Sequence, residues 1–104
     1  MARKQGLRVE GANDVVDEIM VSGSPTGKEV IMCVGEMGGA AVSLKTSLLV
    51  DGERSPVYNI PGDSDYTENF AVEVTVGYKN PIIVSVAGAS AGTDLYLSVV
   101  TSEV

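Results

Sequence analysis

The chain has 104 residues, with 14 acidic and 7 basic side chains, no histidine, no tryptophan, one cysteine and a net charge of −7. Without histidine there is no Ser-His-Asp triad and no histidine-ligated metal, and one cysteine forms neither an internal disulfide nor a cysteine-rich zinc site. The acidity argues against nucleic-acid binding, and we expect a single small domain with no cofactor and no enzymatic activity.

The N-terminal residues 1–14 are predicted to form a polar arm ahead of one domain at residues 15–104. Arg3, Lys4 and Arg8 give the first eight residues a charge of +3, whereas the remaining residues carry −10. A basic arm on an acidic body is typical of docking onto an acidic neighbour, and the alternative is a solvated tail. No apolar segment of a signal peptide follows Met1, and the longest apolar run, Val30–Val34, is far below the roughly 20 residues of a membrane span. We therefore expect synthesis in the cytoplasm and no membrane partner.

Residues 13–20 are the one candidate for a helix. Asn13 or Asp14 could cap a turn containing Val15, Val16, Ile19 and Met20. Two turns are too few to be stable alone, and the same residues fit a polar connection into a strand that begins at Ile19.

From residue 19 onward the apolar residues recur with a period of two, which is typical of strands with one face on a core. Val30–Val34 is predicted to be a strand covered on both faces, with Cys33 as a small buried hydrophobe instead of a reactive thiol. Seven strands are predicted, at residues 19–22, 28–34, 41–50, 57–60, 69–76, 82–87 and 94–101.

Glycine, proline, asparagine and aspartate separate these strands about every ten residues. Asp51-Gly52 is the strongest hairpin signal, although Pro56 indicates a loose or edge return strand. Short strands at this spacing predict an all-β antiparallel β-sandwich of jelly-roll or immunoglobulin-like type.

Few segments of the sequence contain a pattern typical of a metal-binding, phosphate-binding or catalytic site. Asp63, Asp65 and Glu68 form a weak calcium candidate, since the loop lacks the remaining ligands and the central glycine of an EF-hand; an exposed turn is the alternative. The glycine-rich residues 35–41 lack the lysine of a phosphate-binding loop. No spacing selects a catalytic pair of carboxylates.

Apolar residues on both faces of several strands predict a partner surface and a homo-oligomer, for which we consider a trimer. Tyr96 alternates with Leu95 and Leu97, so we expect it on the outer face or at a subunit contact.

Three segments in order support a resemblance to known proteins: residues 38–44 (GGAAVSL), the Asp51-Gly52 turn, and residues 86–95 (VAGASAGTDL). This order resembles small β-sandwich virion proteins of tailed bacteriophages, namely capsid decoration (cement) proteins and related head-fibre or tail components. The similarity covers roughly residues 28–101, and the aromatic residue that often follows the turn in such proteins is replaced here by Arg54-Ser55-Pro56-Val57.

The resemblance implies a structural protein of the virion that binds the major capsid protein or other virion subunits on the capsid surface and stabilises the head shell. Arg3, Lys4, Arg8 and Tyr96 are then the candidate contact residues. The alternative is a carbohydrate-binding module or adhesin that uses tyrosines and the loop with Asp63, Asp65 and Glu68.

Overall fold

The computed structural model describes residues 6–20, 28–60, 65–77 and 80–101, and every regular element among them is a β-strand. The strands are β1 (Gly6–Glu10), β2 (Val15–Met20), β3 (Lys28–Glu36), β4 (Ala41–Thr46), β5 (Leu49–Val50), β6 (Glu53–Arg54), β7 (Tyr58–Asn59), β8 (Phe70–Thr75), β9 (Ile82–Ala87) and β10 (Asp94–Thr101). No helix long and apolar enough to cross a membrane occurs among these residues.

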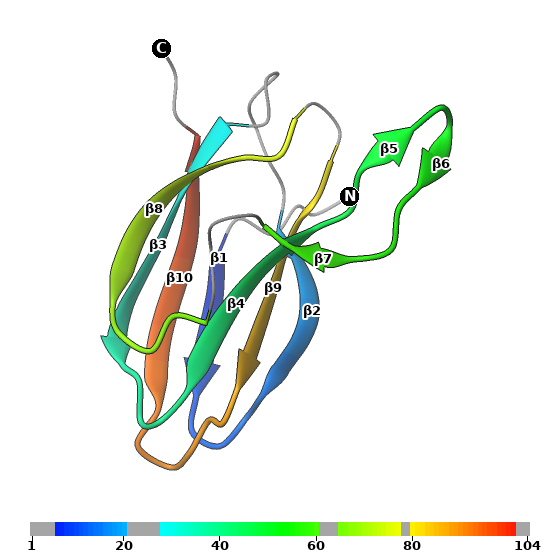
Figure 1. Cartoon of the computed structure of the whole chain (residues 1–104). Coiled ribbons are helices and arrows are strands. Elements are labelled where there is room, and N and C mark those ends of the chain that lie inside the picture. Colours follow the sequence, from blue (N-terminus) through cyan, green and yellow to red (C-terminus); the bar gives the residue numbers. More distant parts are fainter. Residues whose placement is uncertain (1–5, 21–27, 61–64, 78–79, 102–104) are drawn as a thin grey trace.

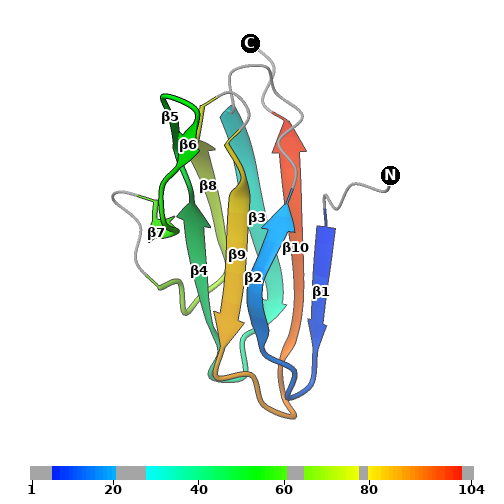
Figure 2. The ribbon, with the colours of Figure 1, turned by 90° about the vertical axis from the view of Figure 1, so that its right-hand side faces the viewer.

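Eight of the strands form two antiparallel sheets that face each other (Figures 1 and 2). Sheet A has the order β1-β10-β3-β8, and sheet B has the order β2-β9-β4-β7. The short strands β5 and β6 form a separate pair. The prediction of an all-β antiparallel sandwich is therefore confirmed, although the described residues form ten strands where seven were predicted.

The strand pairing is that of one long hairpin that has been rolled up. β1 pairs with β10, β2 with β9, β3 with β8 and β4 with β7, so the first half of the chain runs antiparallel to the second half. Two further pairings, of β10 with β3 and of β9 with β4, complete the four-stranded sheets. This connectivity is that of a jelly roll, one of the two sandwich types expected from the sequence.

The core lies between the sheets and consists of the residues that the period of two places inward. Valine, leucine and isoleucine dominate it, and burying each such side chain contributes about 1.5–3 kcal/mol. Sheet A contributes Val9, Ile31, Cys33, Val74, Leu95, Leu97 and Val99, and sheet B contributes Met20, Val42, Leu44, Ile82, Val84 and Val86. Cys33 is fully buried, as predicted.

Three loops at one end of the sandwich are joined by hydrogen bonds around Thr93. The Thr93 hydroxyl donates to the carbonyl of Met37 (2.9 Å) and accepts from the amide of Ser90 (2.9 Å). The amide of Gly11 donates to the Thr93 carbonyl (2.8 Å). A Cβ on Gly38 would lie 2.6 Å from the Thr93 hydroxyl oxygen, so this contact requires glycine. The glycine-rich motifs at residues 38–44 and 86–95 thus meet in the fold and form this junction.

The N-terminal third differs most from expectation. Residues 6–10, expected in a polar arm, form β1, because Leu7 and Val9 alternate with Arg8 and Glu10 and place their side chains toward the core. Residues 15–20, considered as a helix or connection, form β2. A β-bulge between Val15 and Glu18 interrupts the period of two there, so the apolar spacing resembles that of a helix.

Two predictions, one about the burial of β3 and one about the length of a strand, are wrong. β3 is not covered on both faces, because Met32 and Val34 lie on the open outer face of sheet A. The predicted strand 41–50 is two strands, because the chain leaves sheet B after Thr46. Beyond that point Ser47 Oγ donates to the carbonyl of Ser55, and the amide of Leu48 donates to Ser55 Oγ.

Candidate interaction surface

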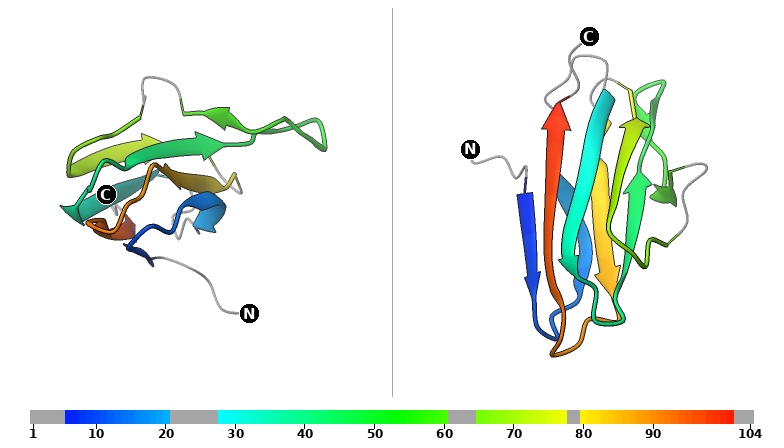
Figure 3. Two further views of the ribbon diagram at one scale, coloured as in Figure 1. Left: turned by 90° about the horizontal axis from the view of Figure 1, so that it is seen from below. Right: turned by 90° about the vertical axis from the view of Figure 1, so that its left-hand side faces the viewer.

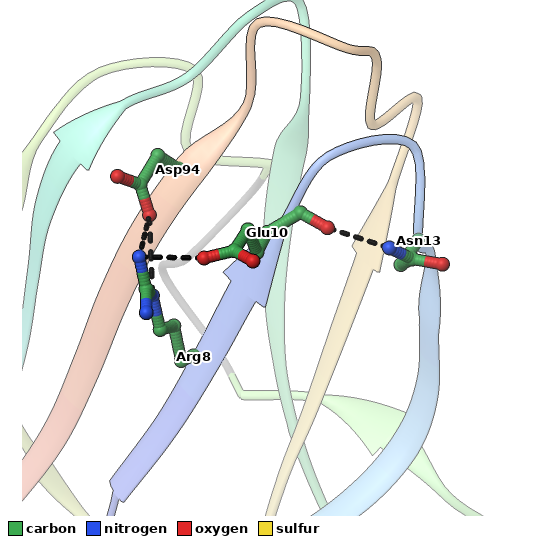
Figure 4. Close-up of polar contacts among 4 residues, drawn as sticks. All are labelled: Arg8, Glu10, Asn13 and Asp94. Atoms are coloured by element: carbon green, nitrogen blue, oxygen red, sulfur yellow. Dashed lines mark hydrogen bonds and ion pairs between the residues drawn. The ribbon is translucent and has the colours of Figure 1, made fainter.

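Of the four predicted contact residues, the described part of the chain contains Arg8 and Tyr96; Arg3 and Lys4 lie outside it. Arg8 is part of sheet A. Its Nη2 atom lies 2.6 Å from Glu10 Oε2 and 3.2 Å from Asp94 Oδ1 (Figure 4). Its guanidinium also lies 4.8 Å from the centre of the Tyr96 ring, within range of a cation–π interaction. The positive charge of Arg8 is therefore already compensated within the chain.

Tyr96 belongs to a small apolar patch on the outer face of sheet A. Cross-strand pairing places Tyr96 between Arg8 and Val34. Met32 lies two residues before Val34 in β3 and therefore on the same face of the sheet. The side chains of Met32, Val34 and Tyr96 are between 42% and 48% exposed. We call these three residues the sheet A patch. Its position confirms the prediction that Tyr96 lies on the outer face.

A larger set of exposed apolar side chains lies on and beside the β5–β6 hairpin. It consists of Leu48, Leu49, Val50, Val57 and Tyr58, which are between 43% and 65% exposed. These are half of the ten large hydrophobic side chains that are exposed among the described residues. We call residues 47–58 the apolar hairpin. It follows β4 and ends with Tyr58, the first residue of β7, and its β5–β6 part extends away from both sheets (Figures 1 and 3).

The turn of the apolar hairpin is of the type that the sequence predicts. Asp51 and Gly52 both have positive φ, 51° and 82°, as a type I′ turn requires, and they connect the paired strands β5 and β6. The Asp51-Gly52 hairpin is thus confirmed. Because this turn matches the natural twist of two strands, the hairpin has a defined conformation at its tip.

The base of the apolar hairpin is held by polar contacts. Arg54 Nη1 donates to the carbonyl of Ser47 and to Asn80 Oδ1, both at 2.8 Å. Asn80 Oδ1 also accepts from the amide of Leu49 (3.2 Å), and its Nδ2 donates to the carbonyl of Val76 (2.7 Å). Ser55 bonds Leu48 in both directions through its amide and its hydroxyl oxygen. These bonds fix the hairpin against the loop between β8 and β9.

Two of the three residues of the calcium candidate lie in the described part of the chain. Asp63 lies outside the described residues. Asp65 accepts a hydrogen bond from Ser43 Oγ at 2.6 Å, and Glu68 is exposed. No group of three or more carboxylate or cysteine side chains in the described part of the chain is arranged to hold a metal ion.

One polar cluster was not predicted. On the outer face of sheet B, Asp17 Oδ1 accepts from Ser85 Oγ (2.9 Å) and from Lys45 Nζ (3.2 Å), while the amide of Asp17 donates to Ser85 Oγ (3.0 Å). These bonds, from Ser85 first and Lys45 second, hold the pKa of Asp17 below its usual value. The φ of Asp17 is +48°, in the left-handed region, at the β-bulge of β2.

This cluster connects β2 to β9 and β4 on the outer face of sheet B. Its three side chains come from strands distant in sequence, and only the strand register brings them together. No local motif could therefore have indicated it.

Comparison with known proteins finds no match: no protein-family model, no curated protein and no solved structure corresponds to this chain.

Proposed function

We propose that this protein is a non-enzymatic structural subunit of a virion, specifically a capsid decoration protein that binds the assembled head shell of a tailed bacteriophage and stabilises it. The observation that carries the proposal is the exposed apolar surface, because the apolar hairpin and the sheet A patch leave large side chains in water that the fold itself does not need. Exposed apolar patches of this kind mark protein–protein contacts.

The fold is compatible with this role but does not decide it. Jelly rolls occur in viral capsid proteins and also in lectins and cupins, and a fold hosts many functions. The resemblance of residues 28–101 to virion proteins favours the capsid among these.

The proposed mechanism is thermodynamic. A protein that binds only the assembled shell stabilises it by RT ln(1 + [L]/Kd), where L is the free decoration protein. Burying the apolar hairpin or the sheet A patch against the shell supplies the affinity, at about 25 cal/mol for each Å² of apolar surface removed from water. No bond is made or broken in this process.

The carbohydrate-binding alternative has less support. Tyr66, one of the tyrosines it would use, is stacked on Phe70 with a distance of 4.0 Å between the ring centres. Asp65 is engaged by Ser43. Tyr66 and Asp65 therefore both have partners within the fold, which makes this alternative the weaker of the two.

The test is to purify particles of the virus whose genome encodes the chain and to identify their proteins by mass spectrometry. We expect the chain to be present in stoichiometric amounts, and particles lacking it to release DNA at a lower temperature and to regain stability when purified protein is added. Absence of the chain from purified particles would overturn the proposal. Light scattering of the free protein tests the predicted homo-oligomer, and a glycan array tests the alternative.

A further inference from the structure

We infer that the apolar hairpin, residues 47–58, is the element that anchors this protein, and that it inserts into an apolar groove bordered by lysine or arginine side chains on a shell subunit. This inference rests on the proposed function and adds to it the docking element and the chemistry of its receptor.

The first argument is the concentration of apolar surface. Leu49 and Val50 form β5 and lie next to the turn, while Leu48, Val57 and Tyr58 flank the base. All five side chains are exposed although each is apolar. The sheet A patch has only three such residues. Since association free energy follows buried apolar side chains near the centre of an interface, the hairpin is the stronger candidate for the anchor.

The second argument is preorganisation. The hairpin contributes no residue to the hydrophobic core, and Ser47 is its one buried residue, yet it is ordered by the Asp51-Gly52 turn and by the bonds of Arg54 and Asn80. A segment that is already ordered loses less conformational entropy when it binds, which raises affinity. These polar contacts are therefore best explained as support for an element that must keep its shape when it meets a partner.

The third argument is the charge of the hairpin tip, which indicates what kind of partner surface binds it. The exposed tip carries Asp51 and Glu53, while the one basic side chain of the hairpin, Arg54, is held at the base by Ser47 and Asn80. Hairpin-to-hairpin contact between two copies would bring four carboxylates together. Docking onto the body of a second copy would bring the acidic tip to a chain of net charge −7. A groove with a positive rim satisfies both the apolar sides and the acidic tip.

The test uses three double variants of the full chain, all at exposed positions. Leu49→Thr with Val50→Thr removes apolar surface from the hairpin and keeps strand-forming residues. Met32→Thr with Val34→Thr is the matched control on the sheet A patch. Asp51→Asn with Glu53→Gln removes the acidic charges, and asparagine retains the positive φ of the turn. Circular dichroism and urea unfolding verify that each variant is folded.

Binding to particles that lack the endogenous protein is measured by cosedimentation at 50 mM and 300 mM NaCl. The hairpin variant is expected to bind at least about tenfold more weakly, and the sheet A variant within about threefold of the wild type. The charge variant is expected to bind more weakly at low salt and to depend less on salt than the wild type.

The outcomes separate the two claims. If the wild type does not bind particles at all, the proposed function fails and the inference fails with it. If the wild type binds and the hairpin variant binds equally well, the function stands and the inference is overturned. The receptor chemistry is wrong if the charge variant binds more tightly, or with an unchanged salt dependence. If the hairpin variant instead converts an oligomer into a monomer, the occupant is a second copy and the inference is likewise overturned.

Discussion

Replacing Thr93 by valine removes a hydroxyl that joins two loops at one end of the sandwich while keeping the shape of the side chain. The hydroxyl oxygen accepts from the amide of Ser90 and the hydroxyl donates to the carbonyl of Met37, and Thr93 is only 2% exposed. In Thr93→Val the Met37 carbonyl keeps its bond from the amide of Ala40 (2.9 Å), but the Ser90 amide loses its acceptor.

The expected loss of stability follows from the two hydrogen bonds of the Thr93 hydroxyl. Each hydrogen bond contributes about 1 kcal/mol, and leaving a partly buried amide without an acceptor costs about 1–2 kcal/mol, the lower part of the range for buried groups. We therefore expect Thr93→Val to lower the free energy of unfolding by about 2–3 kcal/mol. For a domain of about 100 residues, each 1 kcal/mol lowers Tm by roughly 4–8 °C, so the expected loss is about 10–20 °C.

The assay is urea unfolding followed by circular dichroism, with two control variants. Thr93→Ser keeps the hydroxyl and loses one buried methyl, which costs about 1 kcal/mol. Thr75→Val changes an exposed residue of β8 and should stay within about 0.5 kcal/mol of the wild type. If Thr93→Val is as stable as the wild type, or if Thr93→Ser is equally destabilised, the reasoning about the hydroxyl is refuted.

Three further predictions concern single residues. Burial raises the pKa of Cys33 to about 11, so at pH 8 iodoacetamide should label the thiol in urea and leave it largely unlabelled in the native protein; equal rates would contradict this. Because the folded-state pKa of Asp17 is lowered, its carboxylate stabilises the fold above about pH 4 and loses this effect as the pH falls through the folded pKa. Asp17→Asn should therefore be less stable than the wild type at pH 7, with a gap in urea midpoints that narrows as the pH falls below about 4; a gap that stays constant argues against it. A Cβ on Gly35 would lie 2.0 Å from the Asp94 carbonyl oxygen, so Gly35→Ala should lower the free energy of unfolding by at least about 3 kcal/mol. Gly52 also has positive φ but has open space around it, so the control Gly52→Ala should cost only about 1 kcal/mol. Similar losses in the two variants would show that the close contact is unimportant.

The regular strands were predictable because one physical rule governs them. Val42 and Leu44 in β4, and Leu95, Leu97 and Val99 in β10, alternate with outward residues, and all five are buried as the pattern predicts. The Asp51-Gly52 turn was predictable for a local reason as well, since few residue pairs adopt two consecutive positive φ values.

The failures have physical reasons too. β1 was predicted as part of a polar arm because of the charges of Arg8 and Glu10. A strand of five residues contains only two inward positions, Leu7 and Val9, which are too few to establish a period of two. In β2 the bulge at Asp17 shifts the register and hides the period of two. Whether an outward face is open or covered, as for Met32 and Val34, depends on what else packs there, and no alternation pattern contains that information.

The candidate surface was only partly predictable. Tyr96 was expected on an outer face because it alternates with buried leucines, and it lies there. The apolar hairpin was expected as a turn but not as an exposed surface, because Leu48 and Val50 continue the inward alternation of β4 in sequence. Only the structure shows that the chain leaves sheet B after Thr46.

The pairing of β1 with β10 has a consequence for how the protein is made. Arg8 and Asp94 are bonded to each other although they are 86 residues apart in the sequence. Among the described strands a ribosome releases β1 before the others, and its neighbour in sheet A, β10, emerges after them. β10 also lies between β1 and β3, so a nascent chain that stops before Asp94 lacks the strand that joins them. The pairs β5–β6 and β4–β7, whose partners are near in sequence, can form during translation, whereas Leu7 and Val9 remain exposed to chaperones or to other chains until β10 has emerged.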